Sequence, residues 1–281
     1  MTPEAVAAGI LPDPTIVLTQ DQIEHYHREG YLVIDQISTP EEIERLRVIY
    51  DRLFEQRAGR ADGNQFDLGG SDEEGKQAVL PQILNPAKYA PELIYGLFRA
   101  NALAIAKQLL GPAASAQGEH AIFKPAKIGA ATPWHQDEAY WGPSMNYNAF
   151  SLWMPLQPAR LDNGCMQFVP GSHRQEIQPH RSINNDPRIH GLEMVDPPSP
   201  DKAVACPLPP GGCTVHHNRT FHYTGPNRSD LPRRAYILGF GTPATPRTDG
   251  RRFPWEEAKQ TGRLERAKAA ADAKQVEPVK V

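Results

Sequence analysis

Proline is the residue that most restricts how this chain can fold. The sequence contains 28 prolines in 281 residues, and most of them lie beyond residue 130. This is about twice the usual share of proline. Because proline disrupts helix interiors and the middle of sheets, this density favours short strands joined by many turns. The length and a hydrophobic content of 40% still allow a substantial core.

The first third of the chain has helical patterns, with a short β run over 31–34 between the first two. We expect a helix over 20–29, because Thr19 and Gln22 have the capping-box form and Gly30 can end it. A second helix is expected from Pro40 to about Gln56, where apolar residues recur with helical spacing. Two further helices are expected over 91–99 and 101–110.

From about residue 116 onward the pattern changes to short apolar runs separated by Pro, Gly and Asn. These runs predict strands over 118–125, 147–156, 165–169, 203–207, 213–217 and 234–241. Helices followed by many short strands predict an α+β chain with a double-stranded β-helix (jelly-roll, cupin-like) core flanked by N-terminal helices. Such a core has a cavity between its two sheets.

We therefore expect one domain over residues 1–281. Its predicted parts are a loose N-terminal arm (1–18), a mainly helical region (19–111), a jelly-roll core (112–245) and an exposed C-terminal helix and tail (255–281). The polar, irregular segments 58–78 and 174–202 are candidate lids over the cavity.

A His-x-Asp motif, His135-Gln136-Asp137, opens the β-rich half of the chain. On a strand, residues two apart share a face, so the imidazole and the carboxylate would lie side by side. One more histidine would complete the 2-His-1-carboxylate set that binds Fe(II) and leaves coordination positions open. The motif alone is weak evidence, because such tripeptides occur by chance.

The third ligand has three candidates by spacing, namely His216, His217 and His222. The first two are adjacent on a predicted strand, so at most one points inward, and each is more often a packed or surface histidine. We favour His222, because the turn over 223–227 can hold it at the rim of a cavity.

Two arginines follow at the start of the last predicted strand. Arg234 precedes the apolar run 235–240. If it faces the cavity, it can clamp a carboxylate through two parallel hydrogen bonds, which lysine cannot do. Arg233 faces the opposite way, and the strand period alone leaves the choice between them even.

Charge and cysteine content exclude several classes. A net charge of −3 with scattered Lys and Arg gives no basic surface for nucleic acid. Three cysteines and the lack of an export signal favour the cytoplasm, and no segment is apolar enough to span a membrane. We expect a small-molecule substrate and a monomer or homodimer.

Several ordered motifs resemble the phytanoyl-CoA dioxygenase family of Fe(II)/2-oxoglutarate-dependent oxygenases. The resemblance extends from about Leu18 to Phe240, and it is clearest in residues 135–137, 152–156, 163–166, 169–173, 222–227 and 233–235. It implies Fe(II), 2-oxoglutarate and O2 as cofactors. Family members that halogenate have a small residue in place of the carboxylate, so Asp137 favours hydroxylation or a related oxidation.

The resemblance also implies roles for single residues. His135, Asp137 and His222 would be the iron ligands, and Arg234, which directly precedes a small residue, would bind the distal carboxylate of 2-oxoglutarate. Four further residues would share that carboxylate or border the cosubstrate, namely Thr224, Trp153, Lys124 and Gln136. Two rivals are a cupin-type metal-dependent isomerase or hydrolase without 2-oxoglutarate, and a catalytically silent binding protein on the same scaffold.

Overall fold

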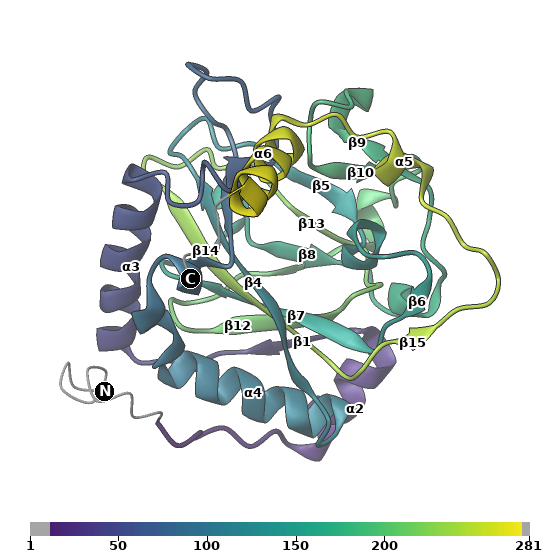
Figure 1. Cartoon of the computed structure of the whole chain (residues 1–281). Coiled ribbons are helices and arrows are strands. Elements are labelled where there is room, and N and C mark those ends of the chain that lie inside the picture. The colour runs from purple at the N-terminus through teal and green to yellow at the C-terminus, as the bar shows by residue number, and fades with distance from the viewer. Residues whose placement is uncertain (1–11, 277–281) are drawn as a thin grey trace, which may run out of the picture.

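Two antiparallel sheets face each other to form the body of the protein (Figure 1). The computed structural model describes residues 12–276. The large sheet has the strand order β1-β12-β7-β14-β4-β3-β2 and the facing sheet the order β11-β8-β13-β5. This arrangement confirms the predicted α+β jelly roll.

The strands of the large sheet are β1 (Tyr31–Ile34), β2 (Gln65–Asp67), β3 (Pro81–Leu84), β4 (Ser115–Lys124), β7 (Ala149–Pro155), β12 (Cys213–His217) and β14 (Arg233–Gly241). The facing sheet contains β5 (Thr132–His135), β8 (Met166–Phe168), β11 (Val204–Cys206) and β13 (His222–Thr224). Two small ribbons pair β9 (His180–Ser182) with β10 (Leu192–Met194), and β6 (Met145–Asn146) with β15 (Thr245–Pro246).

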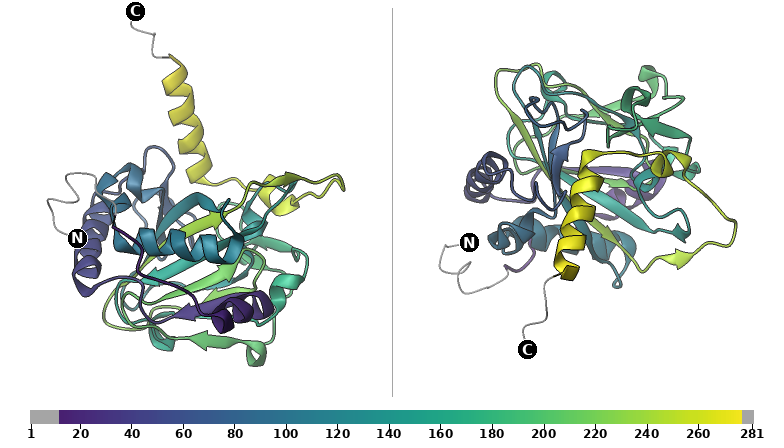
Figure 2. Two further views of the ribbon diagram at one scale, coloured as in Figure 1. Left: turned by 90° about the horizontal axis from the view of Figure 1, so that it is seen from below. Right: turned by 45° about the horizontal axis from the view of Figure 1, so that its top comes forward.

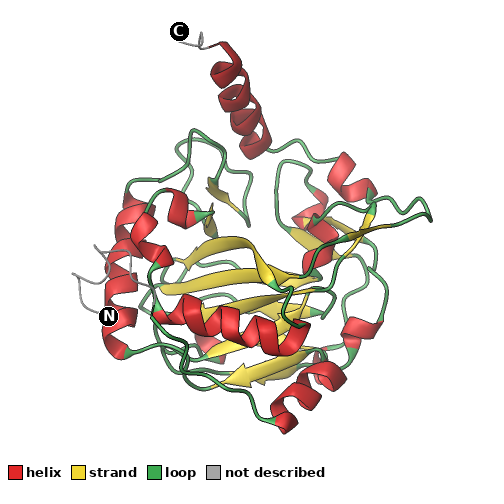
Figure 3. Cartoon of the chain, turned by 60° about the horizontal axis from the view of Figure 1, so that its bottom comes forward, coloured by secondary structure: helices red, strands yellow, loops and turns green. Residues whose placement is uncertain are grey.

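Three N-terminal helices pack on the outer face of the large sheet, and α4 lies across it (Figure 3). They are α2 (Gln20–Glu29), α3 (Pro40–Glu55) and α4 (Leu97–Leu110). Thr19 and Gln22 form the predicted capping box of α2. The prediction of two helices over 91–99 and 101–110 is wrong, because a short 3-10 turn (Pro91–Ile94) precedes one continuous helix that begins after Gly96.

The region predicted as mainly helical also supplies β1, β2 and β3 to the large sheet. Each of these strands has only three or four residues. The structure confirms the predicted β run over 31–34 as β1, whereas β2 and β3 are too short for a period-two pattern to stand out. The N-terminal part of the chain is therefore joined directly to the sheet that carries the cavity.

The central strands of the large sheet are buried on both faces. Along β14, Tyr236 and Leu238 pack with the helices, whereas Ala235 and Ile237 pack between the sheets. Side chains alternate along a strand, so Arg233 shares the inner face and Arg234 the helix face. This alternation decides which arginine can reach the cavity.

Both ends of the described chain differ from their predictions. Residues 12–18 are held on α4, where the Thr15 amide donates to Asn101 Oδ1 (2.7 Å) and the Leu18 amide to Gln108 Oε1 (2.8 Å). This part of the arm is therefore not loose, and residues 1–11 lie outside the described residues. At the other end, α6 (Gly262–Val276) projects from the body (Figure 2), but its first turn contributes to the cavity.

Among residues 12–276, we find no helix with the length and hydrophobicity needed to cross a membrane.

Candidate functional site

Two histidines meet across neighbouring strands of the facing sheet. β5 ends at His135, β13 begins at His222, and the strand register pairs these two residues directly. Their ring centroids lie 4.0 Å apart. The sheet therefore places both imidazoles at one point on its inner face, as cross-strand pairing requires.

Asp137 approaches the same point from a turn. β5 stops at His135, and Asp137 begins the 3-10 turn Asp137–Tyr140, so the motif does not lie on one strand as predicted. Its Oδ1 atom lies 3.6 Å from His135 Nε2 and 3.3 Å from His222 Nε2. Among the described residues, these three offer ligand atoms that all lie within 4.8 Å of one another.

Hydrogen bonds fix the tautomer of both histidines. His135 Nδ1 lies 2.8 Å from the Pro133 carbonyl oxygen, and His222 Nδ1 lies 2.9 Å from that of Thr220. A carbonyl can only accept, so each Nδ1 carries the proton and donates it. Each Nε2 is then left with a lone pair directed at the site, which is the usual arrangement of metal-binding histidines.

The protonation states also suit a metal ion. Burial lowers the pKa of His135, with His222 adding to the shift, so the ring is neutral at neutral pH. Burial alone would raise the pKa of Asp137, but the surrounding imidazoles, His222 first, hold it well below its usual range. Two imidazoles, which bind a metal in their neutral form, and one carboxylate are the donor set that Fe(II) takes in a facial site.

The second oxygen of Asp137 has its own partners on the large sheet. Ser151 donates its hydroxyl hydrogen to Oδ2 at 2.5 Å, and His216 Nε2 lies 3.3 Å from the same oxygen. Of the adjacent pair on β12, His216 lines the cavity and His217 does not. Sequence reasoning missed Ser151, although it precedes Trp153 by two positions and so shares its inward face.

The prediction that Arg234 faces the cavity is wrong. Its guanidinium lies on the helix side of the sheet and forms a two-armed ion pair with Asp51 of α3, at 2.6 and 2.9 Å. Arg233 lines the cavity instead. The hydrophobic pattern could not separate the two, because both faces of β14 are apolar.

Arg233 is a buried charge without a counterion. It is 1% exposed, its Nε and Nη1 atoms have no hydrogen-bond partner, and among residues 12–276 it forms no ion pair. Its guanidinium carbon lies 5.3 Å from the ring centroid of Trp153. Burial lowers its pKa to about 9, so it is still charged at neutral pH. Buried unpaired charges are costly, so these donors point to an anionic ligand.

Two of the four expected cosubstrate contacts line the cavity and two do not. Trp153 and Thr224 line it, with Thr224 bonded to Thr132 (Oγ1 to Oγ1, 3.1 Å). Lys124 is buried behind the cavity, where its ammonium donates to backbone carbonyls, including those of Ala130 (2.7 Å) and Gly225 (2.6 Å). The prediction that it borders the cosubstrate is therefore wrong, since it stabilises the loop after β13 instead.

Gln136 also points away from the cavity. Its amide accepts from the Gln178 N–H (2.8 Å) and donates to the Arg219 carbonyl (2.9 Å). It lies between two residues that face inward, so it must face outward and cannot bind the cosubstrate as predicted. It fastens the 174–202 segment to the metal-binding strand.

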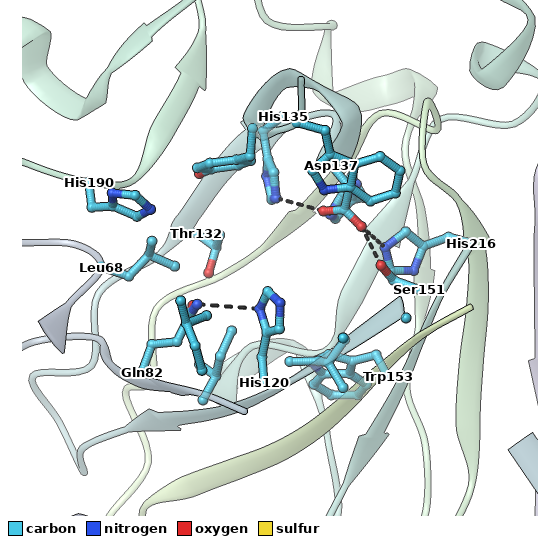
Figure 4. A pocket seen from close by; sticks show the side chains of 18 of the residues that line it. Leu68, Gln82, His120, Thr132, His135, Asp137, Ser151, Trp153, His190 and His216 are labelled. Carbon is cyan, nitrogen blue, oxygen red and sulfur yellow. Dashed lines mark hydrogen bonds and ion pairs between the residues drawn. The ribbon is translucent and has the colours of Figure 1, made fainter. Parts of the chain in front are cut away.

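The cavity has a volume of about 440 Å³ and opens beside the His–Asp–His group (Figure 4). Both segments predicted as lids reach it, with Leu68 from 58–78 and His190 from 174–202. Whether they close over a substrate stays a prediction. The outer end is lined by residues of the C-terminal segment, namely Glu256, Lys259, Arg263 and Leu264, which were expected to be exposed.

A His–Asp–His group with a buried arginine inside a double-stranded β-helix defines a non-haem iron oxygenase. Comparison with known proteins agrees. Residues 26–235 match the family model "Phytanoyl-CoA dioxygenase (PhyH)". The chain belongs to the phytanoyl-CoA dioxygenase family and is an Fe(II)- and 2-oxoglutarate-dependent oxygenase.

Solved structures and relatives support this membership. EvdO2 from Micromonospora carbonacea var. aurantiaca has 40% sequence identity and a TM-score of 0.75, covering 87% of this chain and 99% of that one. The structure of EvdO2 in complex with 2-oxoglutarate has 36% sequence identity and a TM-score of 0.73, again covering 87% of this chain and 99% of that one. A probable alpha-ketoglutarate-dependent hypophosphite dioxygenase of Stutzerimonas stutzeri is 27% identical over 227 residues, 78% of this chain and 77% of that protein.

Proposed function

We propose that this oxygenase hydroxylates, or otherwise oxidises, an unactivated C–H bond of a small molecule. His135, Asp137 and His222 would hold Fe(II), and Arg233 would bind the distal carboxylate of 2-oxoglutarate. With O2, this iron and cosubstrate supply an oxidation that releases succinate and CO2. Asp137 supports hydroxylation over halogenation, because its carboxylate fills the ligand position that a halide would need.

The protein's own residues orient the reactants and keep water out. Ser151 and His216 contact the outer oxygen of Asp137, which leaves Oδ1 turned toward the two imidazoles. Trp153 covers one side of the Arg233 guanidinium. In such an apolar setting a charge-assisted pair is stronger than in water, so the cosubstrate is expected to bind in one orientation.

The unpaired Arg233 is the observation that carries this proposal. A cupin-type isomerase or hydrolase could use the same metal ligands, but its chemistry gives no reason for a buried carboxylate clamp beside them. A silent binding protein would equally have no need for both features together. The intact metal group and a positioned clamp favour turnover.

The test is succinate release in air with Fe(II) and 2-oxoglutarate, screened across a metabolite library. We expect slow release without substrate and a clear increase with a true substrate, accompanied by a product heavier by one oxygen atom. If iron and 2-oxoglutarate bind but no condition yields succinate, the proposed activity is wrong.

Residues 12–276 are expected to act as one catalytic unit, since the helices, both sheets and the C-terminal segment all build or support the cavity. The three cysteines are free and buried, which supports a reducing compartment and hence the cytoplasm as the place of action.

A further inference from the structure

The outer end of the cavity has a different chemical character from the metal end. It is formed by the α5–α6 segment, with α5 spanning Pro254–Glu257, together with His190 and with His120 of β4. This end bears Lys259 and Arg263 but only one carboxylate, Glu256. Any group that a substrate places there meets these side chains.

The C-terminal segment is anchored firmly enough to act as a wall. The Trp255 indole N–H donates to the Ala139 carbonyl and the Gln260 amide to that of Pro187, both at 2.9 Å. Arg266 forms an ion pair with Asp72 and donates from Nε to the Arg60 carbonyl at 3.1 Å. The segment is therefore tied to the turn after Asp137 and to both irregular loops.

The charges on this wall do not balance. Lys259 is 8% exposed and is paired with Glu256. Arg263 has no hydrogen bond or ion pair with any described residue, and its Nε atom is buried without a partner. Its guanidinium carbon lies 5.1 Å from the ring centroid of Phe66, which fixes its direction but provides no counterion. One positive charge is thus left over.

Two histidines add hydrogen-bond donors around the same space. Gln82 donates to His120 Nδ1 at 3.3 Å, so the neutral His120 ring carries its proton on Nε2. His190 Nδ1 is buried without a partner. Burial lowers the pKa of both rings, so each offers one N–H without adding charge. Figure 4 shows both histidines at the cavity.

The surface between this wall and the metal is largely apolar. Side chains of Leu68, Ile122, Tyr140 and Ile237 line it. The Tyr140 hydroxyl accepts from the Leu192 amide at 2.7 Å, so mainly its ring is left to face a ligand. The cavity thus joins an apolar middle to a cationic outer end.

We propose that the substrate carries an oxyanion, a carboxylate or a phosphate, which Arg263 binds at the outer end while the apolar part lies against these apolar side chains. A guanidinium suits both groups, because its planar fork donates two parallel hydrogen bonds. This inference rests on the proposed function, since it takes the cavity to be the substrate pocket.

Calorimetric binding to the anaerobic protein saturated with Fe(II) and 2-oxoglutarate tests this inference. The probes are hexanoate, hexyl phosphate and hexan-1-ol, which share one apolar chain, and saturating 2-oxoglutarate keeps the anions away from Arg233. We expect at least one anion to bind about tenfold or more tighter than the alcohol. The anion that binds more tightly shows whether the site prefers a carboxylate or a phosphate.

Arg263→Gln should remove most of that preference, and Arg252→Gln should retain it. Arg252 lies two residues before this segment, and its side chain is exposed and paired with Glu257 outside the cavity. Equal binding of all three probes, no binding of either anion at millimolar concentration, or an unchanged preference in Arg263→Gln would overturn the inference. A protein that fails to bind 2-oxoglutarate at all would instead contradict the proposed function.

Discussion

The two ends of the cavity are built in different ways. Apart from Asp137, which lies in a turn, the metal end comes from strands of the sandwich, β5, β7, β13 and β14, whose hydrogen-bonded register fixes each side chain. The outer end comes mainly from the α5–α6 segment, with further side chains from the irregular loops and from His120 of β4. The strands specify the chemistry, and the loops and C-terminal segment can vary to specify the substrate.

This difference explains which properties the sequence can predict. The spacing of His135 and Asp137 keeps these two side chains close even though Asp137 lies in a turn, whereas the outer wall forms only after distant segments have packed. The contrast between the two ends leads to four predictions.

The largest effect is expected for Asp137→Ala. This change removes the anionic ligand and leaves only the two imidazoles, so affinity for Fe(II) should fall by more than about 100-fold, beyond the loss seen when supporting residues are changed. Succinate release should become undetectable. Anaerobic titration with Fe(II) measures the affinity.

Asp162→Ala is the matched control, because that carboxylate is exposed and paired with Arg160. It should bind iron as the unchanged protein does. Normal iron binding by Asp137→Ala would show that the metal is held elsewhere.

The second-largest effect is expected for Glu138→Ala, in the turn between the metal end and the outer end of the cavity. Glu138 is fully buried and accepts from Asn218 (2.6 Å), Arg219 (2.8 Å) and Arg251 (2.7 Å). Glu138→Ala leaves buried donors and charge unpaired, which typically costs about 3–5 kcal/mol. Urea unfolding should show this loss in the free energy of unfolding.

Glu257→Ala removes an exposed carboxylate from the same C-terminal segment, and its cost should stay below about 1 kcal/mol. If the free energy of unfolding falls by a similarly small amount in both variants, the buried hydrogen bonds of Glu138 do not hold the outer wall in place.

The third effect distinguishes the two neighbouring arginines. Arg233→Gln should raise the KM for 2-oxoglutarate by roughly 30-fold or more, since truncating one partner of a buried charge pair costs about 2 kcal/mol or more. Arg234→Gln breaks contacts with Asp51 and Phe123 on the helix side of the sheet and should leave this KM nearly unchanged. The reverse pattern in steady-state kinetics, a raised KM for 2-oxoglutarate in Arg234→Gln and not in Arg233→Gln, would show that Arg234 binds the cosubstrate.

The fold and the metal group were largely predictable, because capping residues, short strands and ligand spacing are local signals. The choice of arginine was not, since Ala235 and Ile237 are as apolar as Tyr236 and Leu238, and only the packed helices show which face is outside. Gln136 could have been assigned from alternation between two inward residues. Arg263 had no local signal, because α6 follows an irregular segment and its position depends on contacts with Asp72 and Pro187.

The smallest effect is a pH dependence of stability from His180. Its Nδ1 donates to the Gln178 carbonyl (2.7 Å) and its Nε2 accepts from the Gln136 amide (3.2 Å), so a second proton would break a contact. Burial lowers its pKa from 6.5 to about 4. Between these values the unfolded state binds more protons, so stability falls as the pH falls below 6.5.

His180→Gln should reduce the stability lost between pH 7.5 and 5.5 by about 1 kcal/mol. Urea unfolding at both values measures it, and His27→Gln, an exposed histidine, is the control. An equal loss in His180→Gln and the unchanged protein would mean that His180 is not held neutral by the fold.

The most direct test of the metal centre is anaerobic absorption spectroscopy of the Fe(II) protein titrated with 2-oxoglutarate. We predict a weak visible charge-transfer band that saturates at one equivalent of cosubstrate, with Arg233→Gln requiring a much higher concentration and Arg234→Gln an unchanged one. No band at any concentration, with iron bound to the protein, would contradict the assignment of the His135–Asp137–His222 group and Arg233 as one site.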